Sequence, residues 1–172
     1  MNFIVAPIQG TEADHLLVRS DRYMASLYPA ESNHLVSSES LRAGDALFLG
    51  VFSSDSSPVN ASPVHQDRIE SHSVHCVGCV AARFYREPTY AEIKRLYVDE
   101  DYRGHGLART LMAEIESGIL DQGIDCARLE MGIYQPEADA LYRSLGYREI
   151  TPFGDYRLDP LSQFLEKSPL SS

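Results

Sequence analysis

The sequence predicts an α/β domain in which helices pack on the faces of a mixed β-sheet. Apolar strand patterns follow one another through the first half of the chain, and after residue 98 strand patterns alternate with helical ones. That order of elements produces a mixed sheet with helices packed on its faces. The chain has 172 residues, of which 44% are hydrophobic and 23% charged, as in an ordinary globular protein. We therefore expect residues 1–172 to form a single domain.

The first half of the chain predicts three strands and one helix. Residues 2–8, "NFIVAPI", predict the first strand. Residues 11–27 have apolar side chains at helical spacing, and Thr11 is the expected N-cap of this helix. Two further strands are expected at 46–52, "ALFLGVF", and 75–85, "HCVGCVAARFY".

Residues 53–73 separate these two strands and predict a long exposed loop. They are rich in Ser and Pro and show no apolar period. A loop of that length is unusual inside a compact domain, so it is either a flap or a contact with another subunit.

Histidines and cysteines gather near the end of this loop, at His65, His72, His75, Cys76 and Cys79. A structural zinc site normally draws on a second ligand pair at a distance, and none follows. Strand alternation also predicts that Cys76 and Cys79, three residues apart, point to opposite faces. We therefore expect no metal. With Cys126, the chain has three cysteines, too few for a disulfide framework, and we expect a reducing, cytoplasmic location.

The second half of the chain predicts strands that alternate with two helices. The strands are expected at residues 92–98, 126–134, 147–153 and 163–167. The first helix follows Gly106, with apolar residues at helical spacing until Gly123. Pro136 opens the second helix and Gly146 closes it.

Two closely spaced glycines, Gly104 and Gly106, stand between the strand at 92–98 and the helix that follows. Glycine removes side-chain bulk where the chain turns, and the start of the helix then offers amide N–H groups that have no partner within the helix. Such a place favours a phosphate or another anion.

The segment "RLYVDEDYRGHGLARTLM", followed later by "QPEADALYRSLGY", resembles the GNAT superfamily of N-acetyltransferases. The resemblance is close over residues 90–150. It implies a mixed, mostly antiparallel central sheet flanked by helices. It also implies an acyltransferase that uses acetyl-CoA as cosubstrate.

By this resemblance, the glycine-containing loop binds the pyrophosphate of acetyl-CoA, with Arg103, Gly106 and Ala108 at the key positions of the family motif. The preceding strand would pair its backbone with the pantetheine arm, and one of its amides would polarise the thioester carbonyl. Gln135 stands where many members have an asparagine that contacts this arm. The expected cofactor-binding residues are Leu96, Tyr97, Val98, Arg103, Gly104, His105, Gly106, Leu107, Ala108, Arg109 and Gln135.

Acetyl transfer to an amine needs a base for the ammonium and an acid for the departing thiolate. Tyr142 stands where the family has its tyrosine acid, and the other interpretation is an aromatic residue of the core. Two glutamates compete for the base: Glu92 ranks first and Glu130 second, each by its position in a branch of the superfamily. Alternation places Glu92, Lys94, Leu96 and Val98 on one face, where Lys94 would salt-bridge Glu92 and weaken it as a base.

The predicted function is N-acetylation of a primary amine of a small molecule, by direct attack in a ternary complex. A catalytically inactive CoA-binding sensor and a protein or peptide N-acetyltransferase are the alternatives. The formal net charge of -10 repels nucleic acid and anionic membranes and attracts cations, and no run is apolar and long enough to cross a bilayer. Residues 22–41 are expected to shape the acceptor pocket, and a homodimer formed through sheet edges is left open.

Overall fold

A computed structural model of the protein describes residues 2–32, 36–42, 45–54 and 74–170. Most of the predicted loop at 53–73, with His65 and His72, lies outside the described residues. The strands are β1 (Phe3–Pro7), β2 (Ala46–Ser53), β3 (His75–Arg86), β4 (Thr89–Val98), β5 (Ala127–Gly132), β6 (Arg148–Ile150) and β7 (Ser162–Lys167). The helices are α1 (Asp14–Leu27), α2 (Ser38–Arg42), α3 (Leu107–Asp121) and α4 (Pro136–Ser144), with short 3-10 turns η1 (Ala30–Ser32) and η2 (Glu100–Tyr102).

The strands form one sheet in the order β1-β2-β3-β4-β5-β7-β6. All neighbouring strands in it are antiparallel except β4 and β5, which are parallel. The chain crosses from β4 to β5 through α3, as a parallel connection requires. The prediction of a mixed, mostly antiparallel sheet is confirmed.

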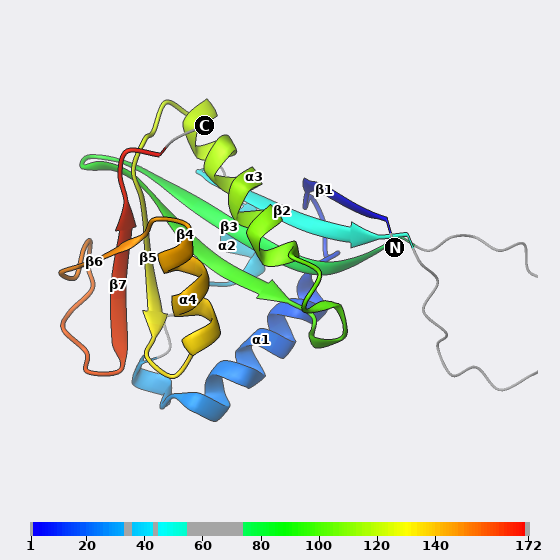
Figure 1. The fold of residues 1–172 in the computed structure, drawn as a ribbon, viewed down its shortest axis with the longest axis horizontal. Coiled ribbons are helices and arrows are strands. Elements are labelled where there is room, and N and C mark those ends of the chain that lie inside the picture. Colours follow the sequence, from blue (N-terminus) through cyan, green and yellow to red (C-terminus); the bar gives the residue numbers. More distant parts are fainter. Residues whose placement is uncertain (1, 33–35, 43–44, 55–73, 171–172) are drawn as a thin grey trace, which may run out of the picture.

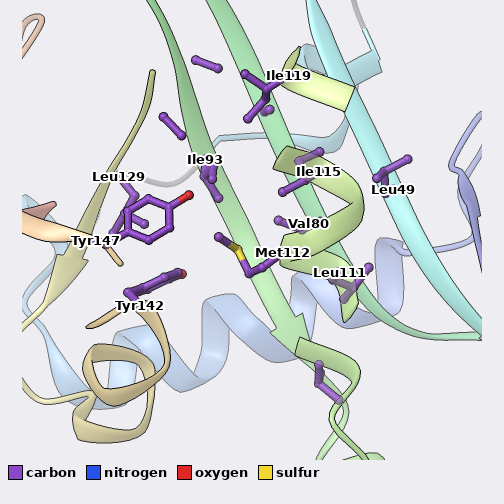
Figure 2. Close-up of a cluster of buried hydrophobic side chains, with 14 of the residues drawn as sticks. Leu49, Val80, Ile93, Leu111, Met112, Ile115, Ile119, Leu129, Tyr142 and Tyr147 are labelled. Atoms are coloured by element: carbon purple, nitrogen blue, oxygen red, sulfur yellow. The ribbon is translucent and has the colours of Figure 1, made fainter. Parts of the chain in front are cut away.

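Helices cover both faces of this sheet (Figure 1). On one face, α3 and α4 pack over the largest buried cluster, to which α3 contributes Leu111, Met112, Ile115 and Ile119 (Figure 2). On the other face, α1 and α2 cover a second cluster that contains Leu16 and Leu41. Within the described residues, no helix is both long and apolar enough to span a membrane.

The predicted ends of the helices are partly confirmed. Helix α1 begins at Asp14, later than expected, because Ala13 is its N-cap and Thr11 supplies only a carbonyl oxygen that accepts from the Asp14 amide. Gly123 follows the end of α3 with φ +71°, and Gly146 follows the end of α4 with φ +95°. Left-handed backbone of this kind is the expected helix terminator.

A β-bulge in β3 reverses one prediction. Phe52 pairs with Cys76 and Val51 with Gly78, so β3 carries one extra residue, Val77, at this point. A bulge of this kind shifts the alternation of side chains by one position. Cys76 and Cys79 therefore both lie in the buried cluster beneath α1, and the expectation that they point to opposite faces was wrong.

A second bulge lies in β4, where Lys94 pairs with Ala81 and Tyr97 with Cys79. Before it, Glu92 and Lys94 share a face and form the predicted salt bridge, with Lys94 Nζ 3.0 Å from Glu92 Oε1. After it, Leu96 and Val98 pack into the cluster beneath α3, on the opposite face. The prediction that Glu92, Lys94, Leu96 and Val98 share one face was therefore wrong beyond Lys94.

Candidate active site

Strands β4 and β5 diverge soon after they meet. Their register contains only Ala91 opposite Ala127 and Glu92 opposite Arg128. Beyond that point β5 continues its pairing with β7, while β4 bends away at its bulge. Figure 1 shows the two strands side by side at one end and separated at the other. The edge of β4 from Ile93 to Val98 that faces β5 therefore has no strand partner within the described residues.

A cavity of about 530 Å³ fills the space between the diverging strands. Its walls come from both sides of the sheet: α3 and α4 contribute on one side, and α1 and η1 on the other. The sequence-predicted site residues that line it are Leu96, Tyr97, Val98, Arg103, Ala108, Glu130, Gln135 and Tyr142. The lining of this cavity therefore comes from both faces of the sheet.

Tyr142 lies on α4, buried to 7% exposure, and it is at once a core residue and a lining residue of the cavity. Its ring packs edge-on against Tyr147, with 5.7 Å between the ring centroids, and its hydroxyl end points towards β4 (Figure 2). Within the part of the chain that the structure describes, this hydroxyl has no hydrogen-bond partner. Burial, followed by the negative charge of Glu130, raises the pKa of Tyr142 well above its ordinary value, so the phenol keeps its proton at neutral pH.

The two candidate bases have different surroundings. Glu130 lines the cavity and accepts a hydrogen bond of 2.6 Å from the Ser162 hydroxyl. Glu92 is absent from the lining, and its side chain is only 4% exposed. It accepts from Tyr156 at 2.6 Å and from Tyr85 at 3.1 Å, besides its ion pair with Lys94. The carboxylate that faces the cavity is therefore Glu130, the second-ranked candidate.

The glycine-containing loop leads from η2 into α3 at one end of the cavity. Gly104 has φ +81° and Gly106, the N-cap of α3, has φ +76°. A Cβ atom at either position would meet nothing within 4 Å, so backbone conformation, rather than crowding, selects glycine here. The first amides of α3 have no acceptor within the helix and lie at this turn.

The other predicted cofactor residues of the loop have defined positions. Leu107 points into the core, which leaves only its backbone for a ligand. His105 Nδ1 lies 3.1 Å from the Arg103 carbonyl oxygen, and Arg109 donates to Ser144 of α4 at 2.7 Å. Arg103 donates through Nε to the Val98 carbonyl at 3.2 Å and remains half-exposed. None of Gly104, His105, Gly106, Leu107 and Arg109 is a lining residue of the cavity.

Sequence reasoning missed several residues of this site. Lys94 and Arg95 line the cavity. In the segment expected to shape the acceptor pocket, Tyr23 lines the cavity, while Tyr28 lies outside the lining. The Tyr28 hydroxyl accepts from the Tyr134 amide at 2.9 Å, and the two rings stack. Gly132 makes this contact fit, because a Cβ atom there would overlap the Tyr28 ring. A glycine at the end of a strand is the one signal in the sequence for the close approach of another side chain. Asn33 and His34, in the segment expected to shape the acceptor pocket, lie outside the described residues.

Three observations fit acetyl-CoA to this cavity. The unpaired edge of β4 suits the amide groups of a pantetheine arm, and the amides at the start of α3 suit a pyrophosphate. The buried Tyr142 hydroxyl, which has no partner among the described residues, suits a hydrogen bond to a ligand. Among the described residues there is no group of three or more histidine, cysteine or acidic side chains that could hold a metal ion.

Comparison with known proteins agrees with this geometry. A family model described as an acetyltransferase (GNAT) domain matches residues 69–149. An "IAA acetyltransferase" of Azospirillum brasilense is 37% identical over 152 residues, which are 88% of this chain and 87% of that protein. The chain therefore belongs to the GNAT superfamily, and it is an acyltransferase that uses acetyl-CoA.

Solved structures show the same fold. A Klebsiella pneumoniae protein described as an acyl-CoA N-acyltransferase is 28% identical, with a TM-score of 0.71 and 96% of each chain covered. The PaiA N-acetyltransferase of Thermoplasma acidophilum, solved in complex with coenzyme A, is 20% identical, with a TM-score of 0.68 over 97% of this chain and 99% of that one. The prediction of the family from its motifs is confirmed.

Proposed function

We propose that the protein transfers the acetyl group of acetyl-CoA to a primary amine of a small molecule, by direct attack in a ternary complex. The observation that carries the proposal is the cavity between β4 and β5, which takes its walls from both faces of the sheet and which Glu130 and Tyr142 both line. Two ligands that approach from opposite faces meet there, so the amine can attack the thioester directly. We also infer that residues 1–172 work as one acetyltransferase domain, since the Azospirillum relative aligns over 88% of the chain.

Acetyl-CoA supplies an acetyl group that is activated as a thioester. The residues that would hold it are those of the β4 edge, Leu96, Tyr97 and Val98, and those of the turn into α3, from Arg103 to Arg109. Gln135, the N-cap of α4, makes no side-chain capping bond and is available to the pantetheine arm. An amide of β4 beyond the bulge would polarise the thioester carbonyl.

Glu130 takes the proton of the acceptor ammonium in this proposal, because it is the candidate carboxylate in the cavity wall. Tyr142 gives a proton to the sulfur that leaves when the C–S bond breaks. The phenol carries its proton at neutral pH, and burial, which raises its pKa, makes it a weak acid in the empty site, so its role rests on its place in the cavity wall and on the basicity of the departing thiolate. Glu92 is buried among Tyr85, Tyr156 and Lys94, and its ion pair holds Lys94, which lines the cavity, in place.

The size of the cavity favours a small-molecule acceptor. A volume of about 530 Å³ is typical of small-molecule sites. The contact of Tyr28 with Tyr134 ties the segment after α1 to the turn before α4, which restricts an extended peptide on that side. Glu130 and Glu137 line the cavity together with Lys94, Arg95 and Arg103, so the preference for an amine rests on Glu130 as the proposed base and on the net charge of -10 of the whole chain.

The test is a thiol-release assay with acetyl-CoA and a panel of a polyamine, an amino acid, an aminoglycoside and a peptide with a free N-terminus. The assay compares the wild type with Tyr142→Phe. We expect kcat of the variant to fall about 100-fold, the usual contribution of a positioned acid, with little change in the Kd of acetyl-CoA.

The matched control is Tyr147→Phe, in which the neighbouring buried ring loses a hydroxyl that donates to Glu116 at 2.9 Å. We expect this change to lower the free energy of unfolding by about 1 kcal/mol and to leave kcat within twofold of the wild type. Acetyl-CoA binding without turnover of any amine would favour the sensor alternative. Turnover of the peptide alone would favour a protein acetyltransferase.

A further inference from the structure

Arg95 has an unusual backbone. It is the only non-glycine residue with a positive φ, +60°, among the residues that the structure describes. It falls in the bulge of β4, within the three-residue step from Lys94 to Tyr97 that faces a two-residue step in β3. An L-residue rarely adopts this conformation unless its surroundings fix it.

The surroundings of Arg95 fix it from three directions. Its side chain is 7% exposed and forms an ion pair with Asp21 of α1. Its Nε donates to the carbonyl oxygen of Val36, just before α2, at 2.9 Å. Its own carbonyl oxygen, displaced from the ladder by the bulge, accepts from the Cys79 thiol at 3.5 Å. Two elements from the α1 side of the sheet therefore hold one residue of β4 in place.

The bulge at Arg95 determines the shape of the cavity. It moves Leu96 and Val98 to the α3 side and Tyr97 to the α1 side. It also bends β4 away from β5, which leaves the β4 edge open to the cavity. If the alternation continued unbroken through residue 95, both the orientation of this edge and the gap between the strands would change.

We propose that Arg95 is a positioning residue for acetyl transfer. Its guanidinium, held by Asp21 and the Val36 carbonyl, keeps its own backbone left-handed and thereby holds the β4 edge at the place where acetyl-CoA binds. Arg95 thus couples the α1 side of the sheet, where the acceptor enters, to the cofactor groove. This inference rests on the proposed function.

Two substitutions separate the effect of the backbone conformation of Arg95 from the effect of its side-chain contacts. Arg95→Ala removes both contacts and leaves a residue that resists a positive φ. Arg95→Gly removes the same contacts but adopts a positive φ freely. Arg19→Ala is the matched control, because Arg19 also joins α1 to the end of β4, through an ion pair of 2.6 Å with Asp99, without touching the bulge.

For each variant we would measure the Kd of acetyl-CoA by calorimetry, kcat and KM per folded molecule, and Tm. We expect kcat/KM for acetyl-CoA to fall about 100-fold in Arg95→Ala, the scale of a small misplacement of catalytic groups. In Arg95→Gly we expect about a tenfold fall, since its backbone can still form the bulge. Arg19→Ala should stay within twofold of the wild type.

Two results would overturn the proposal. The first is an Arg95→Ala protein whose kcat, KM and Kd for acetyl-CoA stay within twofold of the wild type at a temperature where it is folded. The second is an Arg95→Gly protein no better than Arg95→Ala. If Arg95→Ala fails to fold, the kcat/KM of Arg95→Gly is compared with that of Arg19→Ala. An Arg95→Gly protein that loses no more activity than Arg19→Ala would then overturn the proposal. If the wild type turns over no amine, the calorimetric Kd still tests Arg95, so the two failures remain distinguishable.

Discussion

At the scale of single residues, Glu92 and Glu130 show how position on one sheet face leads to different chemistry. Both project from the face that also carries Arg128 and Glu166, but Glu92 is surrounded by donors while Glu130 borders open space. A buried carboxylate that accepts from two phenols and an ammonium has its hydrogen-bonding capacity filled, so it is poorly placed to take a proton from an acceptor amine. A carboxylate in the cavity wall can exchange a proton with it.

Glutamine substitutions at these two positions should therefore differ in kind. Glu130→Gln should lower kcat about 100-fold, since it removes the proposed base, and should leave Tm near that of the wild type. Glu92→Gln should instead lower the free energy of unfolding by roughly 3–5 kcal/mol, because Lys94 loses its ionic partner in a buried place. Steady-state kinetics and chemical denaturation of both variants measure the two effects. A fully folded Glu92→Gln protein without turnover would restore Glu92 as the base.

At the scale of elements, helix α3 has a left-handed glycine at each end: Gly106 at its N-cap and Gly123 beyond its C-terminus. The two positions have φ values of +76° and +71°, and a Cβ atom at either would touch nothing within 4 Å. The two glycines differ in their neighbours, because the amides after Gly106 face the proposed pyrophosphate site and Gly123 lies at the other end of the helix.

Alanine at either glycine should cost about 1–2 kcal/mol of stability, the cost of a left-handed L-residue. Only Gly106→Ala should also weaken the binding of acetyl-CoA, because relief of the backbone strain turns the first amides of α3 away from the ligand. We expect its Kd to rise about tenfold, which corresponds to about 1.4 kcal/mol. Calorimetry and thermal unfolding of both variants provide the comparison. Equal Kd values in Gly106→Ala and Gly123→Ala would argue against a cofactor role for this turn.

At the scale of the whole molecule, the stability of the fold depends on pH through four tyrosines, of which Tyr142 and Tyr147 are buried and Tyr85 and Tyr156 half-buried. Burial, with the charge of Glu92, raises the pKa of Tyr85 to about 12, and the same two causes raise the pKa of Tyr156 further. On the α3 side, burial raises the pKa of Tyr142 and of Tyr147, with smaller contributions from Glu130 and Glu116 respectively. All four phenols bind their protons more tightly in the folded protein than in the unfolded chain, where the pKa is 10.0.

The sign of the effect follows from proton linkage. The stability that these tyrosines contribute is fully present below pH 10 and is lost as the pH rises from there through their folded-state pKa values. We expect the free energy of unfolding to be insensitive to them between pH 7 and about pH 9 and to fall steadily above about pH 10. Denaturation curves across this range, with phenolate absorbance to follow ionisation, measure it. Phenolate signals from these residues at pH 10 in the folded protein would contradict the prediction.

Much of this protein is determined by its sequence alone. The apolar period placed the strands and the helices α1, α3 and α4 but not the short helix α2, and the glycines at 104, 106, 123 and 146 marked turns that all have positive φ. The spacing between the glycine-containing loop and "ALYRSLGY" identified the superfamily. These features are local, since helical spacing, strand alternation and the φ preference of glycine each act within a few residues.

Only the tertiary structure decided which carboxylate faces the cavity and where the cavity lies. The shape of the cavity depends on the bulge in β4, which no local pattern around Arg95 indicates, and Glu92 is excluded from the cavity by its contacts with Tyr85 and Tyr156, residues of other elements. The contacts that hold Arg95 come from Val36 and Asp21, 59 and 74 residues earlier in the chain. Alternation along a strand predicts side-chain faces only while the ladder is regular. Where two strands and a distant helix together fix one extra residue, the faces reverse, because the register belongs to the assembled sheet and not to the strand.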